Sequence, residues 1–230
     1  MIIKPREPGE GHAEYAYRVM RTNIMNLEME PGMVINEKEI AARLGVSRTP
    51  IHEAVLRLKN DFLVDIIPRK ESKVSYIDID RIADGFFIRR TMEAAVFKSA
   101  IGRVSVDYRR KMQEVLEEQR DIIEHEKWES YLESDDKFHK LIYLAADKPF
   151  CYEMVSQSCS HFTRMRYLTL LLSDLDFIVD SYNQHEQMLR MLVFGADPDF
   201  DIDEYFTNHM KGFQEVLPGI DAGYSKYFIF

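Results

Sequence analysis

The sequence predicts a mostly α-helical protein with one β-hairpin in its N-terminal third. Apolar residues recur at helical spacing over most of the 230 residues, and two adjoining β-prone runs stand out between residues 63 and 77. Polar, Gly and Pro residues divide the remainder into short segments, as in a helical bundle. We expect two domains. Residues 1–77 hold a helix at 12–27, two shorter helices and the hairpin, and residues 78–230 hold six to seven helices.

Composition is that of an ordinary globular protein. The chain is 46% hydrophobic and 30% charged, and no apolar run approaches the roughly 18 residues that span a bilayer. Cys151 and Cys159 form neither a disulfide framework nor a zinc knuckle. Because a reducing compartment suits this cysteine usage, we expect a cytoplasmic protein with no membrane partner.

Acidic residues are concentrated in the second domain. Residues 1–77 hold 12 Lys and Arg against 11 Asp and Glu, whereas the rest of the chain holds 18 against 28. The first domain can therefore present a basic face although the net charge of the chain is −9. A nucleic-acid partner is compatible with that distribution.

Two short helices around a glycine form the centre of the first domain. Asn36 and Glu39 have the spacing of a capping box at the start of a helix over residues 37–44. Gly45 makes the turn to the next helix, for which Ser47 is the expected N-cap. This arrangement predicts a helix-turn-helix.

The helix after Ser47 has one apolar face and one polar face. Its apolar positions recur at helical spacing and comprise Ile51, Ala54, Val55 and Leu58. In a helix-turn-helix, the N-terminal end of the second helix reaches base edges in the major groove. The candidates for DNA contact on this helix are Ser47, Arg48, Thr49, His52 and Arg57.

A basic hairpin follows. The β-prone runs 63–67 and 73–77 flank a short polar loop, which is typical of a hairpin. Arg69, Lys70 and Lys73 gather at its tip, where they can contact phosphate or the minor groove. A hairpin in this place would serve as a wing.

The motif IAARLGVSRTPIHEAV at residues 40–55 resembles the signature of the GntR family, and the resemblance extends over residues 12–77. It implies a bacterial transcriptional regulator that binds a palindromic operator as a homodimer. The usual contact positions of the family fall on Lys38, Arg48, His52 and the wing. Two residues depart from the pattern, because His52 replaces Arg and Glu71 replaces Gly, and both leave the operator sequence open.

One carboxylate and three histidines of the second domain could share a metal ion. Asp135 and His139 are four residues apart, so both project from one helix face. His185 and His209 lie in later amphipathic segments. This donor set suits a divalent ion such as zinc, nickel or iron. Alternatively, Asp135 and His139 form a surface or capping pair and each later histidine is a core residue.

Residues 79–215 resemble the C-terminal domain of the FadR subgroup of the same family, which is called FCD. The matching features are RRTME at 89–93, DDKFH at 135–139, QH at 184–185, and His209. The resemblance implies that the metal ligands are Asp135, His139, His185 and His209. It also implies an effector, often a small carboxylate, beside the metal. The loop at 193–203 is longer and more acidic than usual and could shift the register of His209.

A carboxylate effector needs a cationic partner. Arg89 best matches the family position in the first FCD helix, and its guanidinium fork suits a carboxylate. Arg164, Arg166 and His161 are weaker candidates, and a surface salt bridge is the alternative for each arginine. Residues 74–82 are the expected mechanical link between the effector site and the DNA-binding domain.

We expect a ligand-responsive regulator, usually a repressor in this family, and not an enzyme. A metal-free regulator that senses a bulkier acyl ligand is one alternative, and a metal-dependent enzyme with a DNA-binding head is another. No nucleophile elbow, phosphate loop or dedicated base motif supports the enzyme. The aromatic tail at 224–230 either packs on its own bundle or covers a dimer surface.

Overall fold

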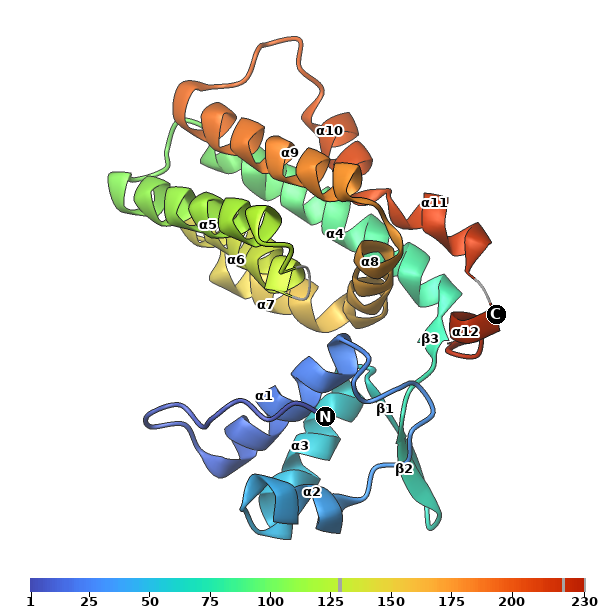
Figure 1. The fold of residues 1–230 in the computed structure, drawn as a ribbon. Helices are drawn as coiled ribbons and strands as arrows, with labels where there is room; N and C mark the ends of the chain where they lie inside the picture. Colours follow the sequence, from blue (N-terminus) through green and yellow to red (C-terminus); the bar gives the residue numbers. More distant parts are fainter. Residues whose placement is uncertain (128–129, 221, 230) are drawn as a thin grey trace. The chain divides into compact units, whose positions relative to one another are not determined.

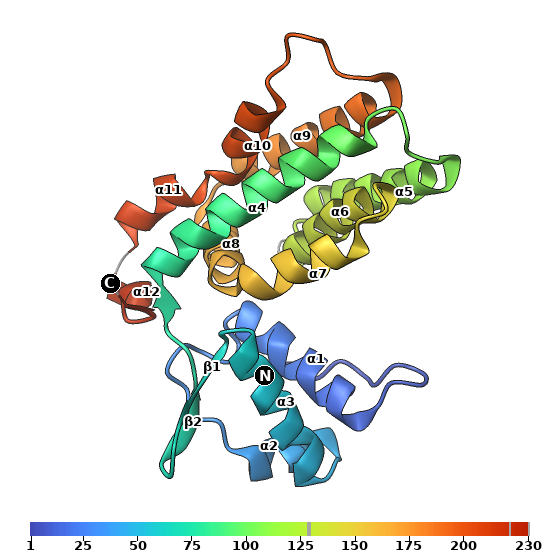
Figure 2. The same ribbon diagram turned by 180° about the vertical axis from the view of Figure 1, so that it is seen from behind.

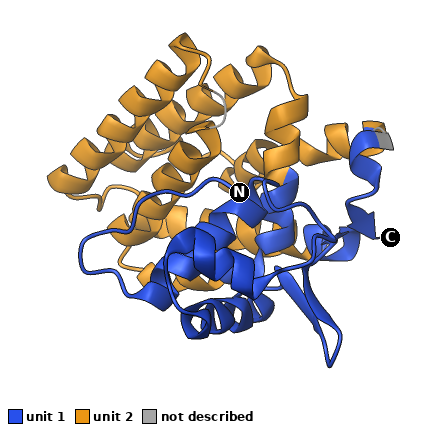
Figure 3. Ribbon diagram, turned by 60° about the horizontal axis from the view of Figure 1, so that its bottom comes forward, with its two compact units in different colours: residues 1–83, 157–165, 220–230 blue, residues 84–156, 166–219 orange. Residues whose placement is uncertain are grey.

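The computed structural model confirms a mostly helical protein with a small β-hairpin (Figure 1). The structure describes residues 1–127, 130–220 and 222–229. Residues 128–129 of the helix expected at 127–146, and Phe230 of the tail, lie outside the described residues. The chain forms two compact units (Figure 3). Unit 1 comprises residues 1–83, 157–165 and 220–230, and unit 2 comprises residues 84–156 and 166–219.

Three helices enclose the core of unit 1, namely α1 (His12–Met25), α2 (Glu37–Leu44) and α3 (Arg48–Asn60). The predicted apolar face of α3 is fully buried, since its four residues are each 0% exposed. It packs in one cluster with apolar residues of α1, such as Val19 and Ile24, and of α2, such as Ile40. The helix-turn-helix is therefore held by apolar burial behind its polar face.

Local signals set the ends of the short helices. The Asn36 side chain accepts a hydrogen bond from the Glu39 backbone N–H at 3.2 Å, which confirms the predicted start of α2. Gly45 ends α2 with φ 66°, a left-handed conformation that glycine adopts without steric cost. Ser47 stands at the N-cap position of α3, as predicted, but its side chain makes no capping hydrogen bond.

The hairpin forms between β1 (Val64–Ile67) and β2 (Glu71–Val74), which pair antiparallel with Val64 opposite Val74. The expectation of a second strand at 73–77 was wrong in its bounds. Pairing ends at Val74, and residues 75–76 leave the hairpin. β3 (Ile77–Asp78) then pairs parallel with β4 (Phe228–Ile229).

The C-terminal tail lies in unit 1, where β4 lies beside β3. The Ile77 backbone N–H donates to the Tyr227 carbonyl at 2.8 Å, and the Tyr227 and Phe228 side chains are buried. The short helix α12 (Ala222–Ser225) precedes this strand (Figure 2). The sequence alone pointed to the bundle or a dimer surface, and it gave no sign of this strand pairing.

Unit 2 is a helical bundle. Its helices are α4 (Ile79–Ala100), α5 (Val106–Glu124), α6 (Tyr131–Ala145), α7 (Pro149–Ser158), α8 (Ser160–Leu172), α9 (Leu175–Phe194), α10 (Ile202–Met210) and α11 (Phe213–Val216), and the 3₁₀ turn η2 (Leu217–Gly219) follows. α5 packs against both α6 and α9. α4, α7 and α8 each have part of their length in unit 1.

Two expected helices are divided. The segment expected to form one helix over 150–173 is interrupted at Cys159, which separates α7 from α8. The segment expected at 203–215 is interrupted before Phe213. A Cβ atom on Gly212 would lie 2.4 Å from the ring of Phe177, so only glycine allows this close approach.

Candidate nucleic-acid interface and metal centre

Most candidate DNA contacts are exposed on unit 1. Lys38 of α2, the five candidates on α3 and its N-cap, and Arg69 and Lys70 at the wing tip are all exposed, whereas Lys73 is half-buried. The N-terminal end of α3 offers backbone N–H groups without intrahelical partners, which favour phosphate. Unit 1 thus presents cations and helix-end donors on α2, α3 and the wing.

Arg57 and Lys73 each contact an aromatic ring of unit 1. The Arg57 guanidinium lies 4.0 Å from the centroid of the Tyr17 ring, and its Nη1 donates to Glu14 at 3.3 Å. Lys73 Nζ lies 5.4 Å from the centroid of the Tyr76 ring. Helical spacing alone could not reveal these partners, because they come from other elements.

His52 is held from one side. Its Nδ1 lies 3.0 Å from Glu37 Oε1 of α2. This contact orients the imidazole and leaves Nε2 as the ring nitrogen available to DNA. The sequence departure at position 52 therefore comes with its own supporting carboxylate.

Replacing Lys70 with alanine should weaken binding to every DNA sequence by a similar factor. The Lys70 side chain is 70% exposed, and its only ion-pair partner among the described residues is Glu71, at 3.7 Å. Loss of one phosphate contact reduces the slope of log K against log salt by about 0.9. Binding titrations at several salt concentrations measure that slope, with Lys59→Ala as the control. A loss confined to one sequence would instead mean that Lys70 reads bases.

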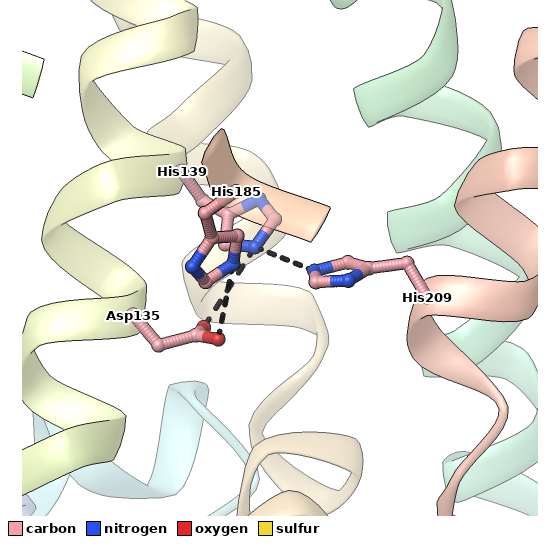
Figure 4. A group of neighbouring side chains, drawn as sticks. All are labelled: Asp135, His139, His185 and His209. Atoms are coloured by element: carbon pink, nitrogen blue, oxygen red, sulfur yellow. Dashed lines mark hydrogen bonds and ion pairs between the residues drawn. The ribbon is translucent and has the colours of Figure 1, made fainter. Parts of the chain in front are cut away.

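Asp135, His139, His185 and His209 come together in unit 2 (Figure 4). One ligand atom from each lies within 4.8 Å of the others. Asp135 and His139 come from α6, His185 from α9 and His209 from α10. The longer loop before α10 therefore does not carry His209 away from the cluster.

Each imidazole has its Nδ1 next to a side-chain oxygen. His139 Nδ1 lies 2.6 Å from Glu93 Oε2, His185 Nδ1 lies 2.9 Å from Gln119 Oε1, and His209 Nδ1 lies 2.5 Å from Gln184 Oε1. These acceptors favour the proton on Nδ1, which leaves the lone pair on Nε2. Oxygen partners on the second ring nitrogen are the usual support of metal-binding histidines.

The Nε2 atoms converge. His139 Nε2 and His209 Nε2 are 3.1 Å apart, and His185 Nε2 lies 3.5 Å from Asp135 Oδ1 without a hydrogen-bond partner among the described residues. Two lone pairs at this separation repel each other, whereas two ligands of one ion at about 2.1 Å lie about 3 to 3.4 Å apart. The residues present thus fit a bound cation.

Electrostatics hold these groups in the states that a cation needs. Burial lowers the pKa of His185 to about 3, and burial together with the neighbouring histidines holds the pKa of His209 well below its usual value. Burial alone would raise the pKa of Asp135, but Arg166 and the histidines outweigh it and hold that pKa far below normal. Neutral imidazoles and an ionised carboxylate are the metal-binding forms.

Two arginines stand beside the cluster. Arg166 of α8 pairs with Asp135 and donates to Asp136 at 2.8 Å. Arg89 of α4 pairs with Glu93 at 2.7 Å and lies 4.0 Å from Asp135. Both arginines line a pocket that also exposes His139 and His209. An anion that entered this pocket would meet two guanidinium groups.

The structure brings Arg89 to the pocket but not Arg164 or His161. Arg164 and His161 belong to unit 1, where they contact residues 62 and 75–78. The cation contributed by α8 is Arg166, two residues further along. Residues two positions apart on a helix, such as Arg164 and Arg166, point in different directions. Sequence spacing alone did not show which of these arginines faces the bundle interior.

Sequence reasoning assigned no supporting role to Glu93, Gln119 or Gln184, although Glu93 and Gln184 lie in motifs that carry the family resemblance. A signal was present for Gln119, which follows Met112 and Leu116 on the buried face of α5 at helical spacing. A polar residue in an apolar stripe needs a buried partner. For Glu93, the signal was its position four residues after Arg89.

Gln119→Leu should lower Zn²⁺ affinity about 10–100-fold, the usual effect of losing a supporting partner of a metal-binding histidine. The Gln119 side chain is 0% exposed, so leucine replaces it in an otherwise apolar stripe. Competition with a chromophoric chelator measures the affinity. Gln113→Leu, an exposed position on the same helix, is the matched control. Unchanged affinity in Gln119→Leu would mean that His185 needs no support from α5.

None of the described helices is long and apolar enough to cross a membrane. Residues 12–74 match the family described as bacterial regulatory proteins, gntR family, and residues 84–196 match the FCD domain. The chain belongs to the GntR family and carries an FCD domain. The DNA-binding part of this GntR regulator therefore precedes an FCD domain that contains Asp135, His139 and His185, and His209 follows the matched residues.

Relatives of this GntR-family chain are transcriptional regulators. The HTH-type transcriptional repressor RspR of Escherichia coli (strain K12) is 28% identical, over 98% of this chain and 96% of its own. The fold matches E. coli McbR/YncC with a TM-score of 0.75 at 18% identity, covering 94% of this chain and 99% of that one. A regulator from Rhodococcus sp. RHA1 gives 0.70 at 18%, covering 91% and 99%. These are regulators and not enzymes.

Proposed function

We propose that this GntR-family regulator is a cytoplasmic repressor that binds a palindromic operator as a homodimer and responds to a small carboxylate held beside a divalent metal. The convergence of three imidazole Nε2 atoms and one carboxylate carries the metal part of the proposal. The ion would be held by Asp135, His139, His185 and His209, and it would supply a positive charge that attracts an anionic ligand.

Pocket size favours a small effector over a bulky acyl ligand. The cavity beside the cluster has a volume of about 60 Å³. Since one water needs about 10–15 Å³ by this measure, there is room for about four to six water-sized groups. Arg166 and Arg89 supply cationic partners for a carboxylate, and apolar residues such as Leu170 and Phe177 enclose the remainder.

The DNA-binding part of the proposal rests on the exposed cations of α2, α3 and the wing. The name of RspR as a repressor supports the sign of regulation. Net acidity outside residues 1–77 would keep the remaining surface away from DNA and leave the basic face as the docking surface.

Elemental analysis of protein purified without a histidine tag or chelator tests the metal. We expect about one equivalent of zinc, nickel or iron per chain. His125→Ala, at an exposed histidine of the same unit, should keep the metal, whereas Asp135→Ala should lose it. No metal after dialysis against each ion would contradict the proposal. A panel of small carboxylates, screened for release of selected DNA, then tests the effector.

A further inference from the structure

The buried side chain of Arg164 forms hydrogen bonds to the segment between the wing and β3. Arg164 is 0% exposed, and its guanidinium donates to the Ser75 carbonyl at 2.7 Å, to Ser75 Oγ at 3.1 Å and to the Tyr76 carbonyl at 3.3 Å. Asp65 is the one carboxylate whose charge favours the ionised guanidinium, and no ion pair within 4.0 Å joins it to Arg164 among the described residues. Neutral backbone and hydroxyl oxygens are its main partners.

His161 adds hydrogen bonds to Phe62, just after the end of α3, and to Asp78 of β3. Its Nε2 donates to the Phe62 carbonyl at 3.1 Å, and its Nδ1 accepts the Asp78 backbone N–H at 3.0 Å. Burial lowers the pKa of His161 to about 3, in agreement with a neutral ring. Phe62 follows α3 with φ 60°, a left-handed conformation in which side chains are rare. Ser75 Oγ also donates to the Phe62 carbonyl, at 2.7 Å.

Burying the charged Arg164 side chain costs free energy. A guanidinium taken out of water without a counter-ion loses hydration that neutral oxygens only partly replace. Burial lowers the pKa of Arg164 to about 9, which reflects that cost. An apolar side chain would fill the same space more cheaply, but it could not bond to two consecutive residues of the linker at once.

Helix α8 carries both Arg164, which bonds to the linker at residues 75–76, and residues that line the pocket. Arg164 lies in the part of α8 that belongs to unit 1, and Arg166 lies in the part that belongs to unit 2. Arg166 pairs with Asp135, and Thr169 and Leu170 line the pocket. A ligand that takes the Asp135 oxygen now paired with Arg166 would change what holds this helix in unit 2.

We propose that Arg164 and His161 are positioning residues through which α8 transmits the state of the pocket to the DNA-binding unit. This inference rests on the proposed function, because it takes the pocket to be the sensing site. α4 offers a second route, since it continues directly from β3 and carries Arg89 and Glu93. Substitution of Arg164 separates the two routes, because it removes the hydrogen bonds from α8 to residues 75–76 and leaves the sequence of α4 unchanged.

Hydrogen exchange of the amides at residues 74–78, in the full chain with and without Zn²⁺, tests the proposal. The Asp78 amide is a direct reporter because it donates to His161. Coupling free energies between sites correspond to about fivefold or more, so we expect at least that change in exchange rate in the wild type. In Arg164→Gln we expect less than about twofold, with unchanged zinc content. Arg164→Lys should recover part of the response.

The control is Arg110→Gln, at an exposed position of α5, which should respond as the wild type does. A full response in Arg164→Gln would overturn the proposal and assign the transmission to α4. An absent response in a zinc-loaded wild type would overturn it as well. If Arg164→Gln does not fold, as judged by circular dichroism, Ser75→Ala takes its place. That substitution removes Ser75 Oγ, which accepts one of the Arg164 hydrogen bonds.

Failure of the proposed function would be recognised separately, as a wild type that takes up no zinc. Arg166→Gln then provides the perturbation, because it breaks the contact with Asp135 at the pocket end of α8 without any metal. If Arg166→Gln alters exchange at residues 74–78 in the wild-type background but causes no further change when it is made in Arg164→Gln, the role of α8 is supported. Unaltered exchange in Arg166→Gln would reject it.

Discussion

His185→Ala is expected to abolish the stabilisation that Zn²⁺ gives to this protein. A ligand present at 1,000 times its dissociation constant stabilises the folded state by about 4 kcal/mol. For a chain of this size that corresponds to an increase in melting temperature of about 8–16 °C. Thermal unfolding with and without Zn²⁺ measures the shift, which should vanish in the variant.

His185 is the right residue for this test because it is 0% exposed and its Nε2 has no hydrogen-bond partner among the described residues. Removing the ring also leaves a cavity, so each variant is compared with its own metal-free form. His125→Ala is the matched control, since that ring is exposed and its ion-pair partner is Asp121, outside the cluster. An undiminished Zn²⁺ shift in His185→Ala would show that the ion binds elsewhere.

Arg48→Ala is expected to weaken specific DNA binding about 5–150-fold, which corresponds to the 1–3 kcal/mol of a bidentate contact to a base. Arg48 is the first residue of α3 and is exposed, so its guanidinium can reach a base edge. The site is first selected from random duplex DNA with the wild-type protein. Binding to the selected and to an unrelated sequence then gives the specificity ratio.

The ratio matters more than the affinity. Loss of a base contact lowers specific binding and leaves non-specific binding almost unchanged, whereas loss of a phosphate contact lowers both. Arg110→Ala, outside the DNA-binding unit, should change neither. An unchanged ratio in Arg48→Ala would mean that the bases are read by other residues, such as His52 and its partner Glu37.

The fold of the first unit could be predicted from sequence because its signals are local. The capping pattern of Asn36 and Glu39 and the left-handed turn at Gly45 act over a few residues, and both are present as expected. The bounds of the second strand could not be predicted in the same way. Ile77 pairs with Phe228, and no local pattern at residues 73–77 distinguishes that partner from β1.

Some residues of the candidate site could be predicted from the sequence, and others could be identified only from the fold. The four cluster residues were found because residue type and family resemblance both point to them. Their partners Gln119 and Gln184 were missed because an amide in a helix has many uses, and only the fold shows which ring nitrogen it meets. Arg164 and Arg166 were not separable by spacing, since helical twist turns residues two apart to different faces.

The pairing of β3 with β4 has a consequence for biosynthesis. It joins residues about 150 positions apart, and such long-range contacts form late because closing the intervening loop costs entropy. During translation, residues 227–229 leave the ribosome after α4 to α10 have already been made. The helix-turn-helix can fold early, whereas the segment that joins it to the FCD domain gains its parallel strand only after that domain has been synthesised. Nascent chains therefore hold a helix-turn-helix before its connection to the FCD domain is complete.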